Sequence, residues 1–209
     1  MNGRFITFEG GEGTGKSTQL KLLANALAAR GFHVVQTREP GGTPEAEALR
    51  NLLVTGATTR WTAEAEALLN YAARDCHLHK IIRPALASGH FVLCDRFMDS
   101  TRAYQGYAGN CDMALLDCLE TAIVGSTRPD LTLILDLDPA EGLARARSRG
   151  DESEDRYERK GLAFHQRLRS GFLQISHSNV ARCRVIDAAG SVGEVASVVH
   201  AAVGHLLDG

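Results

Sequence analysis

The sequence has no apolar run long enough to cross a membrane, and no basic N-terminal stretch followed by an apolar segment. It also has no excess of basic residues, because 23 Lys and Arg face 25 Asp and Glu and the formal net charge is -2. Proteins that wrap nucleic acid polymers usually carry a basic face and a high pI. These absences predict a cytoplasmic protein that uses neither a membrane nor a nucleic acid polymer as partner.

Cysteine is scarce, with five residues, an odd number, and no C-x-x-C motif. We interpret the cysteines as free thiols in a reducing compartment. Cys76, His77 and His79 are close in sequence, but their spacing matches no structural zinc pattern, and we interpret this stretch as the surface of a helix. The chain also lacks the guanine-reading N-K-x-D of regulatory GTPases, and its D-x-x-G at 187–190 lies too near the C-terminus for a switch motif.

The length of 209 residues, with 44% hydrophobic and 23% charged residues, fits one domain spanning 1–209 with a substantial core. Short apolar runs alternate with longer helical patterns. The expected strands are 5–8, 33–38, 91–95, 131–138 and 183–188, and the clearest expected helices are 16–30, 44–53, 62–87 and 192–207. This alternation predicts a doubly wound, three-layer α/β sandwich with a parallel sheet of about five strands.

The sequence Gly10-x-x-x-x-Gly15-Lys16-Ser17 fits the P-loop pattern, and it lies between an expected strand and an expected helix. Backbone N–H groups of such a loop surround phosphates, the lysine reaches the β- and γ-phosphates, and the serine hydroxyl binds Mg²⁺. We therefore predict a nucleoside triphosphate with Mg²⁺ as a ligand. The predicted loop residues are Gly10, Gly11, Glu12, Gly13, Thr14, Gly15, Lys16, Ser17 and Thr18.

A kinase also needs a pocket for the acceptor, and arginines should converge there if the acceptor is an anion. Asp95 and Arg96 close the third expected strand, where ligands gather in doubly wound sheets. Asp95 is a candidate for Mg²⁺, and Arg96, Arg38 and Arg74 are candidates for the acceptor. The alternative is a P-loop ATPase or switch that hydrolyses nucleotide to control a partner.

With these residues in place, the sequence resembles the bacterial thymidylate kinase (dTMP kinase) family over nearly its whole length. The shared stretches, in the family's order, are FEGGEGTGKSTQ, TREPGGT, YAAR, DRFMDSTRAYQG, the Arg-rich run near 149–156, and VIDA. The resemblance implies a P-loop nucleoside monophosphate kinase that converts ATP and dTMP to ADP and dTDP. It also implies a homodimer and a dependence on Mg²⁺.

The resemblance also implies roles for individual residues. Glu12 matches a carboxylate that touches the sugar 3′-hydroxyl, and Tyr104 matches a tyrosine packed under the deoxyribose. Asp95 matches an acidic residue near Mg²⁺ and the phosphates. The remaining implied matches are Arg38, Arg74 and Arg96 around the acceptor phosphate, Ser100, Thr101 and Gln105 beside the base, and Asp187 and Ala188 beside the adenine.

The Arg-rich segment at approximately 147–158 is expected to be a short lid. In one class of this family the P-loop carries a catalytic arginine, and in the other a lid supplies it; here that loop position is Gly13. Arg149 and Arg156 are the candidates for the catalytic arginine, with Arg147 third, because phosphoryl transfer needs positive charge on the transferring group. The alternative for this segment is a solvated helix end with ion pairs.

One position departs from the family pattern. An aromatic residue that stacks on the thymine usually stands four residues before the arginine of YAAR, and here that position is Asn70. Tyr71 should face another way, because one step along a helix rotates a side chain by about 100 degrees. Asn70 is expected to hydrogen-bond the base or a water, or Phe97 or Tyr107 covers the ring instead. The departure leaves open another nucleoside monophosphate kinase with a different base preference.

Overall fold

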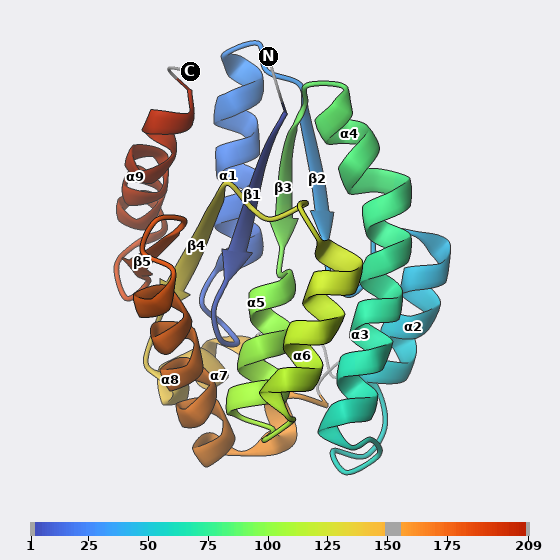
Figure 1. Cartoon of the computed structure of the whole chain (residues 1–209). Helices are drawn as coiled ribbons and strands as arrows, with labels where there is room; N and C mark the ends of the chain where they lie inside the picture. The colour runs from blue at the N-terminus through green and yellow to red at the C-terminus, as the bar shows by residue number, and fades with distance from the viewer. Residues whose placement is uncertain (1–2, 149–155, 208–209) are drawn as a thin grey trace.

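A computed structural model describes residues 3–148 and 156–207, and it shows a central sheet between two layers of helices (Figure 1). The five strands are all parallel and lie in the order β2-β3-β1-β4-β5. Their bounds are β1 (Arg4–Glu9), β2 (Val34–Arg38), β3 (Phe91–Asp95), β4 (Leu131–Asp136) and β5 (Cys183–Asp187). The predicted α/β fold and the five predicted strands are confirmed, with boundaries that differ by at most two residues.

Nine α-helices are found in the described part of the chain. They are α1 (Lys16–Ala29), α2 (Pro44–Val54), α3 (Ala63–His77), α4 (Arg83–Ala87), α5 (Met98–Thr101), α6 (Met113–Leu119), α7 (Pro139–Arg147), α8 (Leu162–Ser178) and α9 (Val192–Val203). Short 3₁₀ turns cover Glu158–Lys160 and Gly204–Leu206. Three π-helical segments, Leu78–Ile82, Arg102–Tyr107 and Glu120–Val124, directly follow α3, α5 and α6. The expected helix at 62–87 is therefore α3, a π segment and α4 in succession.

The two faces of the sheet are covered by different helices (Figure 1). On one face α1 and α9 pack on alternate side chains of β1, β3 and β4, such as Ile6, Leu93 and Leu133. On the other face α3, the π segment after it and α6 cover Phe5 and Val92. Strands that are buried on both faces have continuous apolar sequences, and this is why the sequence pattern predicted their positions to within two residues.

All five strands point the same way, so the segments that follow them gather at one edge of the sheet, at the lower end of Figure 1. In the sheet register Arg38 of β2 and Phe8 of β1 both lie beside Asp95 of β3. The chain leaves β1 into the loop that begins at Gly10, and it leaves β3 into Arg96. This edge therefore brings the P-loop and the predicted acceptor residues together. In the described ranges, no helix combines the length and the apolar character needed to span a bilayer.

Candidate active site

The phosphate loop ends in a helix whose N-terminus is left open. Thr43 and Thr62 cap α2 and α3 with their side chains, whereas α1 starts after Gly15 without a side-chain cap. The first backbone N–H groups of a helix have no partner inside it, and together with the helix dipole they attract anions. The open start of α1 is therefore suited to phosphate.

Lys16 folds back over the loop that precedes it. Its ammonium nitrogen donates to the carbonyl of Gly11 at 2.6 Å and lies 3.3 Å from the hydroxyl of Thr14. The side chain is buried, and burial, followed by the positive charge of Arg96, lowers the pKa of Lys16 to about 8. Glu12 and Asp95 oppose this shift, and a phosphate beside the ammonium would add further negative charge that favours its protonated form.

Gly13 cannot be replaced by a residue with a side chain without a clash. Its backbone is left-handed, with φ of +67°, and a Cβ atom there would lie 2.0 Å from the carbonyl oxygen of Gly142 in α7. A Cβ on Gly142 would in turn lie 2.4 Å from the carbonyl oxygen of Glu12. This close packing of the loop against α7 excludes an arginine at position 13.

Ser17 and Asp95 place two oxygen donors together beside the loop. The hydroxyl of Ser17 donates to Oδ2 of Asp95 at 2.5 Å. Hydroxyl and carboxylate oxygens are the donor types that Mg²⁺ takes, usually from one or two protein groups while water and substrate phosphates complete the coordination. The donor set therefore fits Mg²⁺. Among the described residues no group of three or more His, Cys, Asp or Glu side chains forms a separate metal site.

Arg96 is held rigidly at the centre of the site. Its backbone is left-handed, with φ of 71°, although it is not glycine. Its guanidinium donates to both carboxylate oxygens of Glu12 at 3.1 Å, to the carbonyl of Gly10 at 2.8 Å and to the hydroxyl of Ser100 at 3.3 Å. It also lies over the ring of Tyr104, 4.9 Å from the ring centre. Strained backbone of this kind persists only where the surroundings fix it, and it is concentrated at functional sites.

Glu12 is the counterion of this arginine. Burial by itself would raise the pKa of Glu12, but the charges of Arg96 and Lys16 outweigh burial and lower it to about 2. The hydroxyl of Tyr104 donates to Glu12 Oε1 at 2.5 Å, and burial raises the pKa of Tyr104 well above its ordinary value. Glu12 is thus an ionised carboxylate with a fixed position between the P-loop and the helical segment that carries Tyr104.

Two cavities meet at these residues. The first contains the P-loop from Glu12 to Thr18 together with Arg38 and Asp95. The second is lined largely by residues of α3 and of the helical segment after β3. Its lining includes Asn70, Arg74, Phe97, Ser100, Thr101, Tyr104 and Gln105. The residues shared by both cavities are Glu12, Glu39, Arg50, Arg96 and Glu158. We call the first the phosphate cavity and the second the nucleoside cavity.

Arg74 lines the nucleoside cavity but not the phosphate cavity. Its Nε donates to Glu39 Oε2 at 2.7 Å and its Nη2 donates to the hydroxyl of Thr101 at 3.0 Å. Its Nη1 is buried without a hydrogen-bond partner in the structure. The guanidinium lies between the rings of Tyr71 and Phe97, with centres 4.5 Å and 5.1 Å away. A buried, unpartnered donor costs free energy unless a ligand accepts from it, so Nη1 marks a place for an acceptor atom.

Asn70 also lines the nucleoside cavity, and its Nδ2 donates to the backbone carbonyl of Glu66 at 2.8 Å. Tyr71 is buried in the core and does not line the cavity, as the rotation along the helix predicts. Of the two aromatic residues considered as substitutes, Phe97 lines the cavity, whereas Tyr107 packs against Gly171 of α8.

Neither of the two lid candidates that the structure describes, Arg147 and Arg156, lines the phosphate cavity. Arg147 is exposed near the end of α7, and Arg149 lies outside the described residues. Arg156 is fully buried, and its Nη2 pairs with Glu66 Oε1 at 2.5 Å. The expectation that Arg156 lies at the phosphates is not met in this structure, because its guanidinium is enclosed among α2, α3 and the loop between them.

Two further predictions, for Arg38 and for Asp187 with Ala188, have different outcomes. Arg38 is about half exposed, lines the phosphate cavity and pairs with Glu47 at 3.1 Å. Asp187 and Ala188 lie at the end of β5, on the same edge of the sheet, but they do not line either cavity. Their contact with adenine therefore stays a prediction.

The interpretation of Cys76, His77 and His79 as helix surface is wrong for His77. That imidazole is fully buried and contacts Glu39 Oε1 at 2.9 Å and the Thr37 hydroxyl at 2.6 Å. The histidine lies next to the glutamate that also binds Arg74, so it has a structural partner rather than a place at the surface.

Sequence reasoning missed several residues that line the cavities: Glu39, Pro40, Arg50, Val54, Tyr157 and Glu158. Glu39 and Pro40 belong to TREPGGT, which the sequence analysis uses only as a family motif. Arg50 lies on α2, and its Nη1 donates to the carbonyl of Pro40 at 3.0 Å. An arginine on the helix that follows such a turn is the one local signal that could have identified it.

Comparisons with known proteins agree with this geometry. A sequence model of the thymidylate kinase family matches residues 8–199. A curated thymidylate kinase of Caulobacter vibrioides is 54% identical over 197 residues, which is 94% of this chain and 94% of that protein. A second, of Afipia carboxidovorans, is 50% identical over 98% of this chain and 90% of that protein. The crystal structure of thymidylate kinase from Ehrlichia chaffeensis matches with a TM-score of 0.79 and 36% identity, over 98% of this chain and 99% of that chain. The chain therefore belongs to the thymidylate kinase family and is a phosphoryl-transferring enzyme.

Proposed function

We propose that this protein transfers the γ-phosphate of ATP to dTMP, giving ADP and dTDP. The observation that supports this most directly is the junction of the phosphate cavity and the nucleoside cavity at Arg96 and Glu12. A donor triphosphate on the P-loop and an acceptor monophosphate in the second cavity would meet at that guanidinium. A hydrolytic switch has no use for a second cavity that joins the phosphate cavity at the same arginine, so membership in the family and the two cavities both disfavour that alternative.

On the donor side, the open start of α1 and Lys16 would hold the β- and γ-phosphates. Ser17 and Asp95 would hold Mg²⁺ together with the phosphate oxygens, and the metal would supply positive charge that offsets the charge of those oxygens. The protein's own contribution is to fix these groups before ATP arrives, as the bond from Lys16 to Gly11 shows.

On the acceptor side, an oxygen of the dTMP phosphate attacks the γ-phosphorus while the bond from γ-phosphorus to the β,γ-bridging oxygen breaks. No general base is needed, because the acceptor phosphate is already an anion. Arg96 orients this phosphate, with Arg38 at the edge of the phosphate cavity. Glu12 and Tyr104, which are joined by a hydrogen bond, would contact the sugar, as the resemblance implies.

At the base, we propose that Arg74 donates through its unpartnered Nη1 to a carbonyl oxygen of thymine. Ser100 and Thr101 line the same cavity, and Phe97 offers an aromatic surface there. This assignment moves Arg74 from the acceptor phosphate, where the resemblance put it, to the base. Asn70 stands at the position of the stacking ring and lines the cavity.

For the catalytic lid arginine we propose Arg149. Arg156 is committed to Glu66 inside the protein, and Gly142 blocks an arginine at position 13. A positive charge supplied to the transferring phosphoryl group typically contributes about 10³-fold or more in rate.

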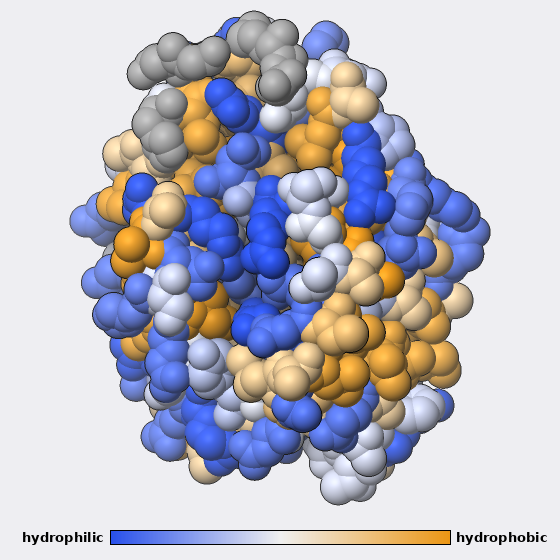
Figure 2. Space-filling view, viewed as in Figure 1, coloured by the Kyte–Doolittle hydropathy of each residue, from blue (hydrophilic) through white to orange (hydrophobic). Residues whose placement is uncertain are grey.

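We also propose that the protein is a cytoplasmic homodimer, as the resemblance implies. Figure 2 shows an apolar area over the part of the surface where Figure 1 places α3 and α6. Leu68 of α3 is one of the exposed apolar side chains, at 52% exposure, and contiguous apolar patches on a surface mark interaction sites. Sedimentation equilibrium would test the assembly, and a monomer at micromolar concentration would contradict it.

The test of function is ADP release coupled to a detectable reaction, with ATP and Mg²⁺ and separately dTMP, dUMP, dCMP, dGMP, UMP or no acceptor. We expect dTMP to give the highest kcat/KM. If another monophosphate gave the highest kcat/KM, the assignment of thymine as the base would be wrong, but the protein would still be a nucleoside monophosphate kinase. If turnover ignored every acceptor, the proposed reaction itself would be wrong.

A further inference from the structure

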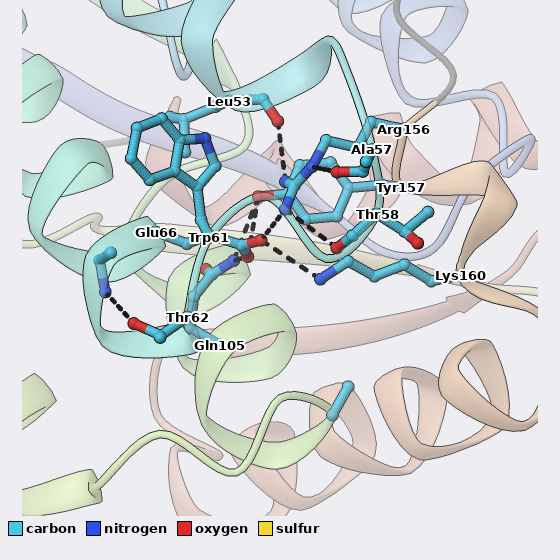
Figure 3. A network of polar contacts seen from close by, with 12 residues as sticks. Leu53, Ala57, Thr58, Trp61, Thr62, Glu66, Gln105, Arg156, Tyr157 and Lys160 are labelled. Atoms are coloured by element: carbon cyan, nitrogen blue, oxygen red, sulfur yellow. Dashed lines mark hydrogen bonds and ion pairs between the residues drawn. The ribbon is translucent and has the colours of Figure 1, made fainter.

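Glu66 is a buried carboxylate at the centre of a network of polar contacts (Figure 3). It does not line the nucleoside cavity, but two residues that contact it do. Four side chains donate to it. Arg156 Nη2 lies 2.5 Å from Oε1, and Lys160 Nζ lies 3.3 Å from the same oxygen. Gln105 Nε2 lies 2.8 Å and the Tyr157 hydroxyl 3.1 Å from Oε2. Two of these donors, Gln105 and Tyr157, line the nucleoside cavity, so Glu66 is one layer away from the ligand.

Arg156, the nearer of the two cations that pair with Glu66, is itself fixed. Arg156 donates through Nε to the carbonyl of Ala57 at 2.9 Å and through Nη1 to that of Leu53 at 2.9 Å. Its Nη2 also donates to the carbonyl of Thr58 at 3.2 Å. Figure 3 shows the guanidinium enclosed by these three carbonyls and Glu66. The ion pair therefore has one geometry, and it holds the carboxylate in one orientation.

The carboxylate decides which way the amide of Gln105 turns. A carboxylate accepts hydrogen bonds and does not donate, so the atom of Gln105 that contacts Oε2 is the nitrogen. That nitrogen also lies 3.3 Å from the Tyr157 hydroxyl, whose own hydrogen goes to Glu66. Both hydrogens of the Gln105 amide nitrogen are thereby engaged on the protein side. The oxygen Oε1 is the polar atom of Gln105 that remains to serve a ligand.

The side-chain amide of Asn70 is oriented by a similar contact. It lines the nucleoside cavity, and its amide nitrogen donates to the backbone carbonyl of Glu66. The side-chain amides of Asn70 and Gln105 thus both donate a hydrogen bond to Glu66. Only Gln105 depends on the carboxylate, because Asn70 donates to the backbone carbonyl.

We propose that Glu66 is a positioning residue that sets the base preference: it turns Gln105 so that an amide oxygen, an acceptor, faces the ring nitrogen of the base. Thymine and uracil carry a hydrogen on ring nitrogen N3 and can donate to that oxygen. Cytosine has an unprotonated N3, an acceptor, which would face the oxygen without a hydrogen between them. This inference rests on the proposed function, since it assumes a pyrimidine monophosphate in the nucleoside cavity.

The test is Glu66→Gln. Arg156 would hold the oxygen of the new amide, so the new amide nitrogen would point at Gln105 and donate to it. Gln105 would then turn its oxygen toward residue 66 and its nitrogen toward the base. We expect the ratio of kcat/KM for dTMP to that for dCMP to fall at least about tenfold, mainly through KM, because one hydrogen bond to the base is reversed in sign. Glu64→Gln, on the exposed side of the first turn of α3, is the matched control and should leave the ratio unchanged.

A purely structural role for Glu66 would lower stability and affect both substrates alike. Two readouts separate it from positioning. In a Gln105→Leu background, Glu66→Gln should no longer change the dTMP to dCMP ratio, because there is no amide left to turn. If Glu66→Gln does not fold, as circular dichroism would show, Tyr157→Phe removes the second anchor of the Gln105 nitrogen and should lower the ratio by a smaller factor.

The inference is overturned if folded Glu66→Gln keeps the dTMP to dCMP ratio of kcat/KM of the unsubstituted enzyme. It is also overturned if the effect of Glu66→Gln persists in the Gln105→Leu background. If only Tyr157→Phe folds, an unchanged ratio in that variant overturns it. Failure of the proposed function looks different, since the unsubstituted enzyme would then show no preference for dTMP at all.

Discussion

The phosphate cavity and the nucleoside cavity use charged residues in opposite ways. In the phosphate cavity Lys16, Ser17 and Asp95 contact one another or the loop and keep capacity for an anion and a metal. Behind the nucleoside cavity, Glu66 and Arg156 are fully enclosed and satisfied by protein atoms. The charged residues of the phosphate cavity are therefore placed to contact the ligand directly. Those behind the nucleoside cavity instead orient the side chains that contact the ligand.

The origin of the two regions in the chain differs as well. The loop from Gly10 to Ser17 is contiguous, and the uncapped start of α1 follows from its own local sequence. The contact between Glu66 and Arg156 joins residues 90 positions apart, and that between Leu53 and Arg156 joins residues 103 apart. The phosphate loop itself is formed by consecutive residues, although its partner Asp95 lies 78 positions away. The network behind the nucleoside cavity has no such contiguous part and forms only after the whole domain has folded.

The largest expected effects concern Arg149 and Arg156, two arginines that the sequence pattern does not distinguish. Arg149→Ala should lower kcat by about 10³-fold, because a positive charge on the transferring phosphoryl group is lost. Thermal unfolding of this variant should be unchanged. Steady-state kinetics and a melting curve on the same preparation give both values.

Arg156→Ala should do the reverse. It leaves the buried Glu66 with Lys160, 3.3 Å away, as its remaining cation and removes the shorter of its two ion pairs. The free energy of unfolding should therefore fall by about 3 kcal/mol in urea titration. Arg184→Ala, at an exposed position on β5, is the control and should change stability by less than about 0.5 kcal/mol. If Arg156→Ala were as stable as the parent but catalytically dead, the two assignments would have to be exchanged.

A second prediction concerns the charge at the P-loop. Lys16→Ala should lower kcat by about 10²–10³-fold, the usual cost of removing one preorganised electrostatic contact to a reacting group. Lys21→Ala, an exposed lysine on the same helix, should keep nearly full activity. Single-turnover measurements with saturating ATP would show whether the chemical step is slowed. An unchanged single-turnover rate would mean that Lys16 only aids binding.

A third prediction concerns the shape of the loop. Gly13→Ala forces a side chain into left-handed backbone and against Gly142, so the free energy of unfolding should fall by about 2 kcal/mol or more. Gly11→Ala is a matched control in the same loop, because a Cβ there meets no atom within 4 Å. Urea unfolding of both variants tests this, and equal midpoints would show that α7 does not restrict the loop.

Sequence reasoning was accurate where structure is local. The strands are continuous apolar runs, and the P-loop is read from eight consecutive residues. It failed for Arg156, because the sequence around this arginine is a mixed charged run, and its burial depends on a carboxylate and on carbonyls supplied by distant segments. It likewise gave no sign of the π-helical turn at 102–107, which carries Tyr104 and Gln105 and has no local signature.

The smallest expected effect concerns Glu9, which ends β1 between the two regions. Its carboxylate accepts from the backbone N–H of Phe97 at 2.8 Å and from the hydroxyl of Ser100 at 2.5 Å. Burial, and then the negative charge of Asp99, raise the pKa of Glu9 to about 8, although Arg96 opposes the shift. Asp99 is in turn paired with Arg182, at 2.6 Å.

Because the pKa of Glu9 is higher in the folded than in the unfolded chain, folding binds a proton between pH 4.5 and about 8. Stability should therefore fall as the pH rises through this range, by about 1 kcal/mol for a step from pH 6.5 to 7.5. Glu9→Gln mimics the protonated acid, since its oxygen can still accept from Phe97 and its nitrogen can donate to Ser100. The variant should lose this part of the pH dependence in urea unfolding, whereas Glu64→Gln should keep it. If Glu9→Gln retained the full slope, Glu9 would be ionised in the folded protein, and the boundary between the two regions would carry a net negative charge that Arg96 must balance.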